Sequence, residues 1–309
     1  MNVKTLQVKD LRWVNVVKPT NEEIEYLRKN FSFHPLDLND CLSSPAQRPN
    51  LDKYTDYMFM ILLFPVFDRK TREIKPSEVD FFIGKDYLVT VHQDNLPPLI
   101  DLFELCSANE QAKDKYLQEG VEKLLFTILN SLFLYCYPML DHVSMDIAQL
   151  ENKIFSGNEK KTVREITVIR RNITSFRRIM QTHKNVLKKL TRSYDSSVFK
   201  LNGLKLYFEQ LIEDSKDIWD TLQGFKEGIE TLQQTNESLI SFRINDIIKT
   251  LTIISALVLP VYVTASIFGL MKGYFPVLGE THNFWLPLAL CFGSALSMYW
   301  FMKKKNMLK

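Results

Sequence analysis

The amino-acid sequence predicts an α+β cytoplasmic domain followed by long α-helices and two C-terminal transmembrane helices. Two runs near the C-terminus, residues 247–268 and 284–302, carry almost no charge. Each is about 20 residues long, which is the length that crosses a bilayer as a helix. Between Pro138 and Pro260 the chain has no proline. That absence favours long helices, because an interior proline removes a helical hydrogen bond.

The N-terminal part, residues 1–118, is expected to form a small α/β domain. Segments rich in β-branched and aromatic residues predict strands at 11–17, 57–67, 79–83 and 87–92. The last two flank Gly84, Lys85 and Asp86, a stretch of the right size for a hairpin turn. Short helices are expected at 21–29 and 36–41.

Residues 119–246 are expected to form a long-helix bundle and a stalk. Polar and glycine-containing breaks at 156–158 and 195–197 leave predicted helices at 119–155, 160–194 and 198–268. The third helix continues into the first membrane segment, and ~70 residues at 1.5 Å per residue would span roughly 105 Å. Its stalk has an apolar stripe at three- and four-residue steps, which includes Leu201, Leu204, Phe208, Leu211, Ile218, Leu222, Phe225, Ile229 and Leu232. Two alternatives explain the stripe: packing on the two preceding helices alone, or additional packing against copies of itself around an axis.

The charges around the apolar runs predict the topology. Residues 303–309 contain four lysines directly after the second transmembrane helix, and Arg243 and Lys249 lie beside the start of the first. The loop between the helices, residues 269–283, has one lysine and one glutamate. Because positive charge concentrates on the cytoplasmic side, both termini are expected in the cytoplasm and the loop outside. The expected partner of this part of the chain is the lipid bilayer of the cytoplasmic membrane.

The first transmembrane helix has a face that mixes small polar groups with apolar side chains. The residues of this face recur at steps of three and four: Asn245, Ile248, Leu251, Ser255, Leu259, Tyr262, Ser266 and Gly269. One interpretation is a hydrated path with hydrophobic constrictions, lined by this helix in an assembly of several copies. The other is that the serines and the glycine only permit close helix packing. Spacing alone leaves both open.

Composition argues against several other classes of protein. The net charge of +3 is too small to suggest a nucleic-acid partner. The chain has no glycine-rich phosphate-binding motif, and its five histidines show no metal-ligand spacing. None of the four cysteines forms a C-x-x-C pair. We therefore expect no enzyme activity, no catalytic residue and no bound cofactor.

Several motifs resemble one known family. They are Arg48-Pro49-Asn50, the segment Phe81 to His92, Arg170-Arg171-Asn172, the segment Asn245 to Ile254 followed by Pro260, and Ile267-Phe268-Gly269. Together they are similar to the CorA-type magnesium transporters, two-helix channels for divalent cations, over nearly the whole chain. The resemblance implies a homopentamer with a funnel-shaped cytoplasmic part and a pore lined by the first transmembrane helix.

The chain departs from this family at the outer mouth of the implied pore. The family signature is Tyr-Gly-Met-Asn, whereas this sequence reads Phe268-Gly269-Leu270-Met271. In the family, the asparagine of this signature offers an amide carbonyl to a hydrated ion. This sequence has Met271 in its place, and a thioether is a poor partner for hydrated Mg²⁺. Gly269, Leu270 and Met271 are therefore the expected mouth residues, with a contribution from Glu280 or Asn283 of the loop.

The functional expectation is Mg²⁺ uptake through a divalent-cation channel or transporter. Asn245 is the expected inner polar ring, and Leu251 and Leu259 are the expected constrictions. The alternatives are a divergent paralogue that transports Zn²⁺, Co²⁺ or Ni²⁺, and a non-conducting membrane scaffold or regulatory subunit. The missing asparagine favours these alternatives, while the intact polar and apolar face of the first helix favours transport.

Overall fold

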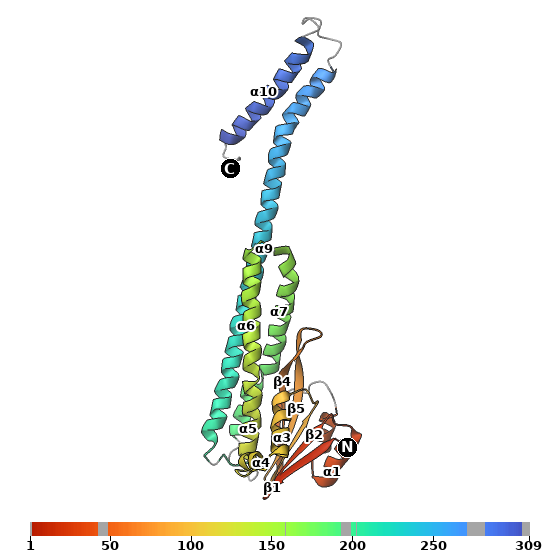
Figure 1. Ribbon diagram of the computed structural model, residues 1–309, viewed down its shortest axis with the longest axis vertical. Coiled ribbons are helices and arrows are strands. Elements are labelled where there is room, and N and C mark those ends of the chain that lie inside the picture. Colours follow the sequence, from red (N-terminus) through yellow and green to blue (C-terminus); the bar gives the residue numbers. More distant parts are fainter. Residues whose placement is uncertain are drawn as a thin grey trace. The chain divides into compact units, whose positions relative to one another are not determined.

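The computed structural model describes residues 2–42, 49–157, 159–192, 199–201, 203–270 and 282–304 (Figure 1). The chain divides into two compact units, residues 1–233 and 234–309. The first unit contains a sheet and most of the helices. The second contains the C-terminal part of one long helix and the helix that follows it.

A six-stranded sheet forms the centre of the first unit. Its strands run in the order β1-β2-β6-β5-β4-β3, with β2 and β6 parallel and the other neighbours antiparallel. The bounds are β1 (Val3–Val8), β2 (Leu11–Val17), β3 (Asn50–Lys53), β4 (Tyr57–Asp68), β5 (Glu73–Gly84) and β6 (Tyr87–His92). The predicted α/β domain and its four strands are confirmed.

The structure also contains strands that the sequence pattern did not predict. β1 lies at the edge of the sheet and is largely exposed, so its charged residues face solvent and hide the strand signal. β5 begins at Glu73, six residues before the predicted strand, because the whole of β4 pairs with it, from Tyr57 opposite Gly84 to Asp68 opposite Glu73. At the β5–β6 turn, a Cβ on Gly84 would collide with the ring of Tyr87, so any larger residue there would require this ring to move.

Helices cover both faces of the sheet, which explains why β4 is buried along nearly its whole length. On one face, α1 (Asn21–Asn30) and α2 (Pro35–Asp40) contribute Ile24, Leu27 and Leu38 to an apolar core with residues of the sheet. On the other face, Trp13 of β2 is fully buried, and its ring meets that of Phe103 edge-on at 4.9 Å. Phe103 lies in α3 (Pro97–Ala108), which is followed by α4 (Glu110–Leu117).

The long-helix region contains more helices than the sequence predicts. The expected helix 119–155 is divided at Tyr135 into α5 (Val121–Leu134) and α6 (Cys136–Phe155). The expected helix 160–194 is divided into α7 (Glu159–Met180) and α8 (His183–Thr191), and the break lets His183 pack its ring between Phe64 and Phe133.

The third predicted helix, 198–268, is shifted at both ends: α9 spans Lys205–Leu270. Gly203 has a φ of 75°, a left-handed conformation that a helix cannot contain, so α9 begins after it. At the other end α9 includes Gly269 and Leu270, which the sequence analysis assigned to the loop. Likewise, α10 (His282–Lys304) includes Asn283 and the first lysines of the expected tail.

The predicted apolar stripe of the stalk is largely covered within the single chain. Phe208, Leu211, Ile218, Leu222 and Ile229 are fully buried. The ring of Phe208 packs against Phe126 of α5, and Arg177 of α7 stacks on Trp219 at 4.8 Å. Packing on helices of the same chain therefore covers most of this stripe, which both alternatives require.

His183 is a buried basic group without a hydrogen-bond partner on either ring nitrogen among the described residues. Its ring is completely inaccessible to solvent and meets the rings of Phe64 and Phe133 edge-on at 5.1 and 5.6 Å. Burial disfavours the charged imidazolium and lowers the pKa of His183 from 6.5 to about 4.

The lowered pKa of His183 predicts acid sensitivity of the first unit. Between pH 6.5 and about 4 the unfolded chain binds a proton at His183 that the folded chain does not, so stability falls as the pH falls through this window. At pH 5.5 the loss relative to pH 7.5 should be on the order of 1 kcal/mol. His183→Leu should reduce the fall in melting temperature between pH 7.5 and pH 5.5. Part of the fall should remain, because burial also lowers the pKa of His92.

The control for this measurement is His142→Leu, because His142 is an exposed histidine of the same unit. Near-ultraviolet circular dichroism of the purified chain at pH 7.5 and 5.5 would record the melting temperatures. A His183→Leu variant with the full wild-type pH dependence would show that His183 is not the responsible group.

Candidate functional site

All eight residues of the predicted polar and apolar face lie on α9, in the second unit of the chain. The large side chains among them are exposed: Ile248 by 55%, Leu251 by 63%, Leu259 by 62% and Tyr262 by 71%. An apolar face with so little contact inside its own chain is available to lipid or to another copy of the protein.

The opposite side of α9 contacts α10 at Cys291. At 100° per residue, Leu257 and Thr264 lie about half a turn from Leu259 and Tyr262. Ile253, Leu257 and Thr264 are each partly buried. The Thr264 hydroxyl oxygen lies 3.2 Å from Cys291 Sγ of α10, and this thiol also donates to the carbonyl of Val261 at 3.8 Å. The α9–α10 contact therefore leaves the large side chains of the predicted face exposed, whereas Ser266 is partly buried.

The contact between Thr264 and Cys291 is not indicated by any pattern in the sequence. Cys291 is recognisable in the sequence only as a cysteine within an apolar run. Its pairing with Thr264, 27 residues earlier, depends on how two helices cross, and no local periodicity encodes that. The Thr264 hydroxyl also lies 2.9 Å from the carbonyl oxygens of Pro260 and Val261, so it has hydrogen-bond acceptors within α9.

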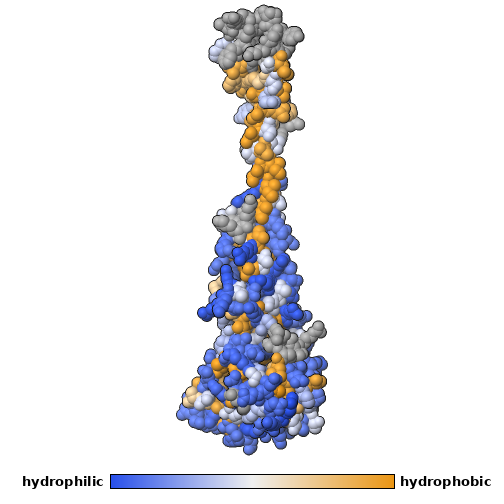
Figure 2. Space-filling view, turned by 90° about the vertical axis from the view of Figure 1, so that its right-hand side faces the viewer, coloured by the Kyte–Doolittle hydropathy of each residue, from blue (hydrophilic) through white to orange (hydrophobic). Residues whose placement is uncertain are grey.

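The C-terminal part of α9 is apolar and free of acidic side chains. From Ile247 to Leu270 its only charged residue is Lys249. Hydropathy and length mark two stretches of the described chain as able to span a membrane. One is 121–155, whose apolar window is half buried in the first unit; the other is 205–267, whose apolar window is not buried at all. Figure 2 shows apolar residues gathered along the second unit and a mostly hydrophilic surface on the first.

The predicted outer mouth is only partly visible. Gly269 and Leu270 end α9, and Leu270 is 85% exposed. Met271 and Glu280 lie outside the described residues, and Asn283 belongs to the first turn of α10. The residues that the structure describes contain no cluster of three or more histidine, cysteine or acidic side chains able to hold a metal ion. Within one chain the candidate site is a helical face rather than a closed cage.

Gln210 is an exposed residue near the start of α9, in the part of the helix expected to form the stalk. Its side-chain amide donates to Asp214 Oδ1 at 2.9 Å, one turn further along α9. The amide is therefore used inside the helix, and it brings no negative charge to the exposed surface of the stalk.

Comparison with known proteins identifies the family. The family described as "CorA-like Mg2+ transporter protein" matches residues 8–304. Among curated relatives, the cobalt/magnesium transport protein CorA of Methanocaldococcus jannaschii is 24% identical over 91% of this chain and 86% of its own length. The protein of the same name from Thermotoga maritima is 25% identical over 96% of this chain and 83% of its own length.

Solved structures share the fold. The complete structure of the CorA magnesium transporter from Methanocaldococcus jannaschii covers 95% of this chain and 90% of that chain, with a TM-score of 0.81 and 22% identity. The full-length CmaX protein covers 95% of this chain and 88% of its own, with a TM-score of 0.74 and 18% identity. The expected CorA-like fold, with its N-terminal α/β domain and its single long helix, is confirmed. Since the family match extends over almost the entire sequence, this chain belongs to the CorA-like Mg²⁺ transporter family.

Proposed function

We propose that this protein is a divalent-cation channel that conducts Mg²⁺ across the cytoplasmic membrane into the cell. The observation that carries the proposal is the uncovered face of α9, which mixes serine hydroxyls with large apolar side chains in a segment that has one charged residue. The relatives named as cobalt/magnesium transport proteins support divalent cations as the cargo. The cation is a transported substrate, and we propose neither a catalytic residue nor a resident cofactor.

The proposed topology places residues 1–118 and 119–246 in the cytoplasm as the α/β domain and the helical stalk. Residues 247–268 and 284–302 cross the membrane, residues 269–283 form the external loop, and residues 303–309 form a basic cytoplasmic tail. The lysines of that tail and Arg243 support this orientation, because positively charged residues are retained on the cytoplasmic side.

Several copies are required for conduction, because two helices cannot enclose an aqueous path. In the proposed homopentamer, α9 of each copy faces the axis. Asn245 then forms a polar ring at the inner end, while Ser255 and Ser266 supply hydroxyls along the path. Leu251 and Leu259 form apolar rings that narrow it and control its hydration. The α9–α10 contact through Thr264 leaves these side chains free to do so.

Selectivity is proposed to arise at the outer mouth, formed by Gly269, Leu270 and Met271 with help from Glu280 or Asn283. Mg²⁺ holds its water shell tightly, so a mouth site must accept hydrogen bonds from those waters. The Met271 thioether accepts them only weakly. A softer sulfur ligand favours transition metals, and this residue is the specific reason to keep Co²⁺, Ni²⁺ or Zn²⁺ as alternative cargo.

Ion flux into reconstituted vesicles tests the proposed function directly. Vesicles loaded with an ion-sensitive dye and containing purified protein should take up Mg²⁺, and parallel experiments with Co²⁺, Ni²⁺ and Zn²⁺ would rank the cargo. Preference for one of the latter ions would identify the divergent-paralogue alternative. The absence of flux of any of these ions would contradict conduction and favour a scaffold or regulatory subunit.

The first structural consequence is the oligomeric state. Native mass spectrometry of the detergent-solubilised protein should show five chains, because several uncovered α9 faces are needed to surround a path. The spectra should be recorded in mild detergent at low collision energy, so that bound lipid is retained and the assembly stays intact. A stable monomer or dimer under those conditions would be incompatible with the proposed pore.

The second consequence concerns Leu259, whose side chain is expected to form an apolar constriction. Leu259→Ala should raise basal Mg²⁺ flux several-fold, because a smaller side chain widens the ring and admits water. Leu257→Ala is the matched control: it makes the same change about half a turn away on α9, where the side chain is partly buried. Equal flux in the wild type and Leu259→Ala, at equal protein amounts, would place Leu259 away from the path.

The third consequence concerns Met271. Cobalt hexammine imitates hydrated Mg²⁺ and should inhibit wild-type uptake weakly, whereas Met271→Asn should be inhibited more strongly because an amide carbonyl accepts hydrogen bonds from the ligand shell. Leu270→Met, a nearly volume-conserving change, is the control and should alter inhibition little. If wild type and Met271→Asn are inhibited equally and tightly, position 271 does not select the ion.

A further inference from the structure

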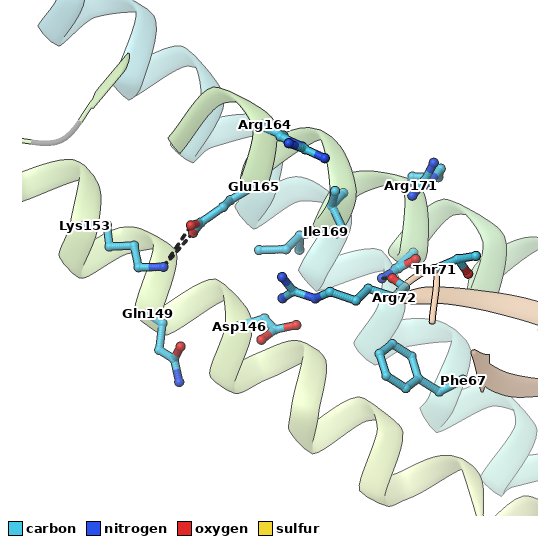
Figure 3. A pocket seen from close by; sticks show the side chains of 12 residues that line it. Phe67, Thr71, Arg72, Asp146, Gln149, Lys153, Arg164, Glu165, Ile169 and Arg171 are labelled. Carbon is cyan, nitrogen blue, oxygen red and sulfur yellow. Dashed lines mark hydrogen bonds and ion pairs between the residues drawn. The ribbon is translucent and has the colours of Figure 1, made fainter. Parts of the chain in front are cut away.

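A cleft with a volume of about 570 Å³ lies in the first unit, between the tip of the β4–β5 hairpin and the helices α6 and α7 (Figure 3). Its volume is within the range of pockets that bind small molecules, about 300–1,000 Å³. None of its lining residues belongs to the candidate ion path. Its chemistry can therefore be considered independently of conduction.

The hairpin tip is held against α7 by one buried asparagine. Asn172 Nδ2 donates to the carbonyl of Arg72 at 2.9 Å, and its Oδ1 accepts from the backbone N–H of Ile74 at 3.1 Å. Ser175 adds a hydrogen bond from its hydroxyl to the Ile74 carbonyl at 2.7 Å. These bonds hold Arg72 at a φ of 56°, in the left-handed region that is unfavourable for most residues. In this conformation its side chain extends into the cleft between α6 and α7 (Figure 3).

Two of the four basic side chains that line the cleft have acidic partners. Lys153 of α6 pairs with Glu165 of α7 at 2.8 Å, and Arg171 pairs with Glu73 at 2.8 Å. For Arg72 and Arg164, no carboxylate of the described chain lies within ion-pair distance. Each of these guanidinium groups is suited to a phosphate group, which guanidinium binds in a bidentate manner.

The remaining lining residues suggest what is attached to the phosphate. Phe67 is 44% exposed and offers its ring to a planar group, and Ile169 adds an apolar wall. Asp146 and Gln149 of α6 offer oxygens that accept hydrogen bonds from hydroxyl or amino groups. An inorganic phosphate would use none of these groups. A ligand with a base, a sugar and phosphates would use all of them.

We propose that this cleft binds a nucleoside polyphosphate, with the phosphates on Arg72 and Arg164, the sugar or base on Asp146, and the base against Phe67. Asn172 is a positioning residue that presents Arg72. The Lys153–Glu165 ion pair joins the two helical walls of the cleft.

Calorimetric titration of the purified full-length chain tests this proposal, with ATP as the probe and EDTA present so that no divalent ion contributes. ATP should bind saturably at one site per chain, and inorganic tripolyphosphate and AMP should bind more weakly. Arg72→Gln should lower the affinity for ATP about tenfold through loss of charged hydrogen bonds. Phe67→Ala should weaken ATP but leave tripolyphosphate unchanged.

Arg178→Gln is the matched control, because Arg178 is an exposed arginine of α7 outside the cleft. It should bind ATP like the wild type. If Arg72→Gln lowers the melting temperature, its weaker binding could reflect a folding defect. Arg164→Gln then tests the site with a change that lies outside the hairpin tip. Absence of saturable ATP binding, or equal weakening by Arg178→Gln, would overturn the site. Equal affinity for ATP and tripolyphosphate, with no effect of Phe67→Ala, would overturn the nucleotide assignment. Because EDTA removes the transported ion, these outcomes do not depend on whether the protein conducts.

Discussion

The continuous hydrogen-bonded backbone of α9 is the constraint on which the rest of the structure depends. This helix runs without interruption from Lys205 to Leu270 and belongs to both compact units. In a bilayer each peptide N–H and C=O needs a partner inside the segment, and a helix provides those partners itself. Pro260 removes one donor from this pattern. The Thr264 hydroxyl, which bonds to the Pro260 carbonyl at 2.9 Å, adds a side-chain donor in the same turn.

The surroundings of α9 change along its length, and the burial of its apolar side chains changes with them. In the first unit Phe208, Ile218 and Ile229 are fully buried against helices of the same chain. In the second unit Ile248 and Leu259 are exposed, although they are equally apolar. Exposure of apolar side chains is costly in water but not in lipid, where helices associate through packing and polar contacts. The same helix can therefore be held by its own domain at one end and remain free for lipid or other copies at the other.

A second set of long-range contacts joins the sheet to the helices of the first unit. Asn172 connects α7 to the β4–β5 hairpin through two hydrogen bonds, in positions about 100 residues apart in sequence. Each such bond contributes on the order of 1 kcal/mol, and loss of a buried partner costs more. This contact gives the hairpin tip a defined conformation. The arrangement of charge in the nearby cleft follows from it, since Arg72 belongs to that tip.

Local patterns in the sequence determined the class of fold, the central strands, and the apolar helices at the C-terminal end. These features depend on periodicity, charge and proline content, which are properties of neighbouring residues. The motifs around Asn245 and Gly269 also identified the family correctly, and the stripe from Ile248 to Ser266 is a regular helical face because α9 is continuous.

Only the tertiary structure decided which surfaces are covered. The breaks within the long helices follow from the packing of buried groups such as His183, and the start of α9 follows from the backbone conformation of Gly203. The direction in which the Leu259 face points was not accessible from spacing, because it depends on the contact of Thr264 with Cys291 on another helix. The hydrogen bonds between Asn172 and the β4–β5 hairpin could not be predicted from the sequence either, because they join residues about 100 positions apart. A side chain's partners far along the chain are set by how whole elements pack, whereas its helix or strand is set largely by its neighbours.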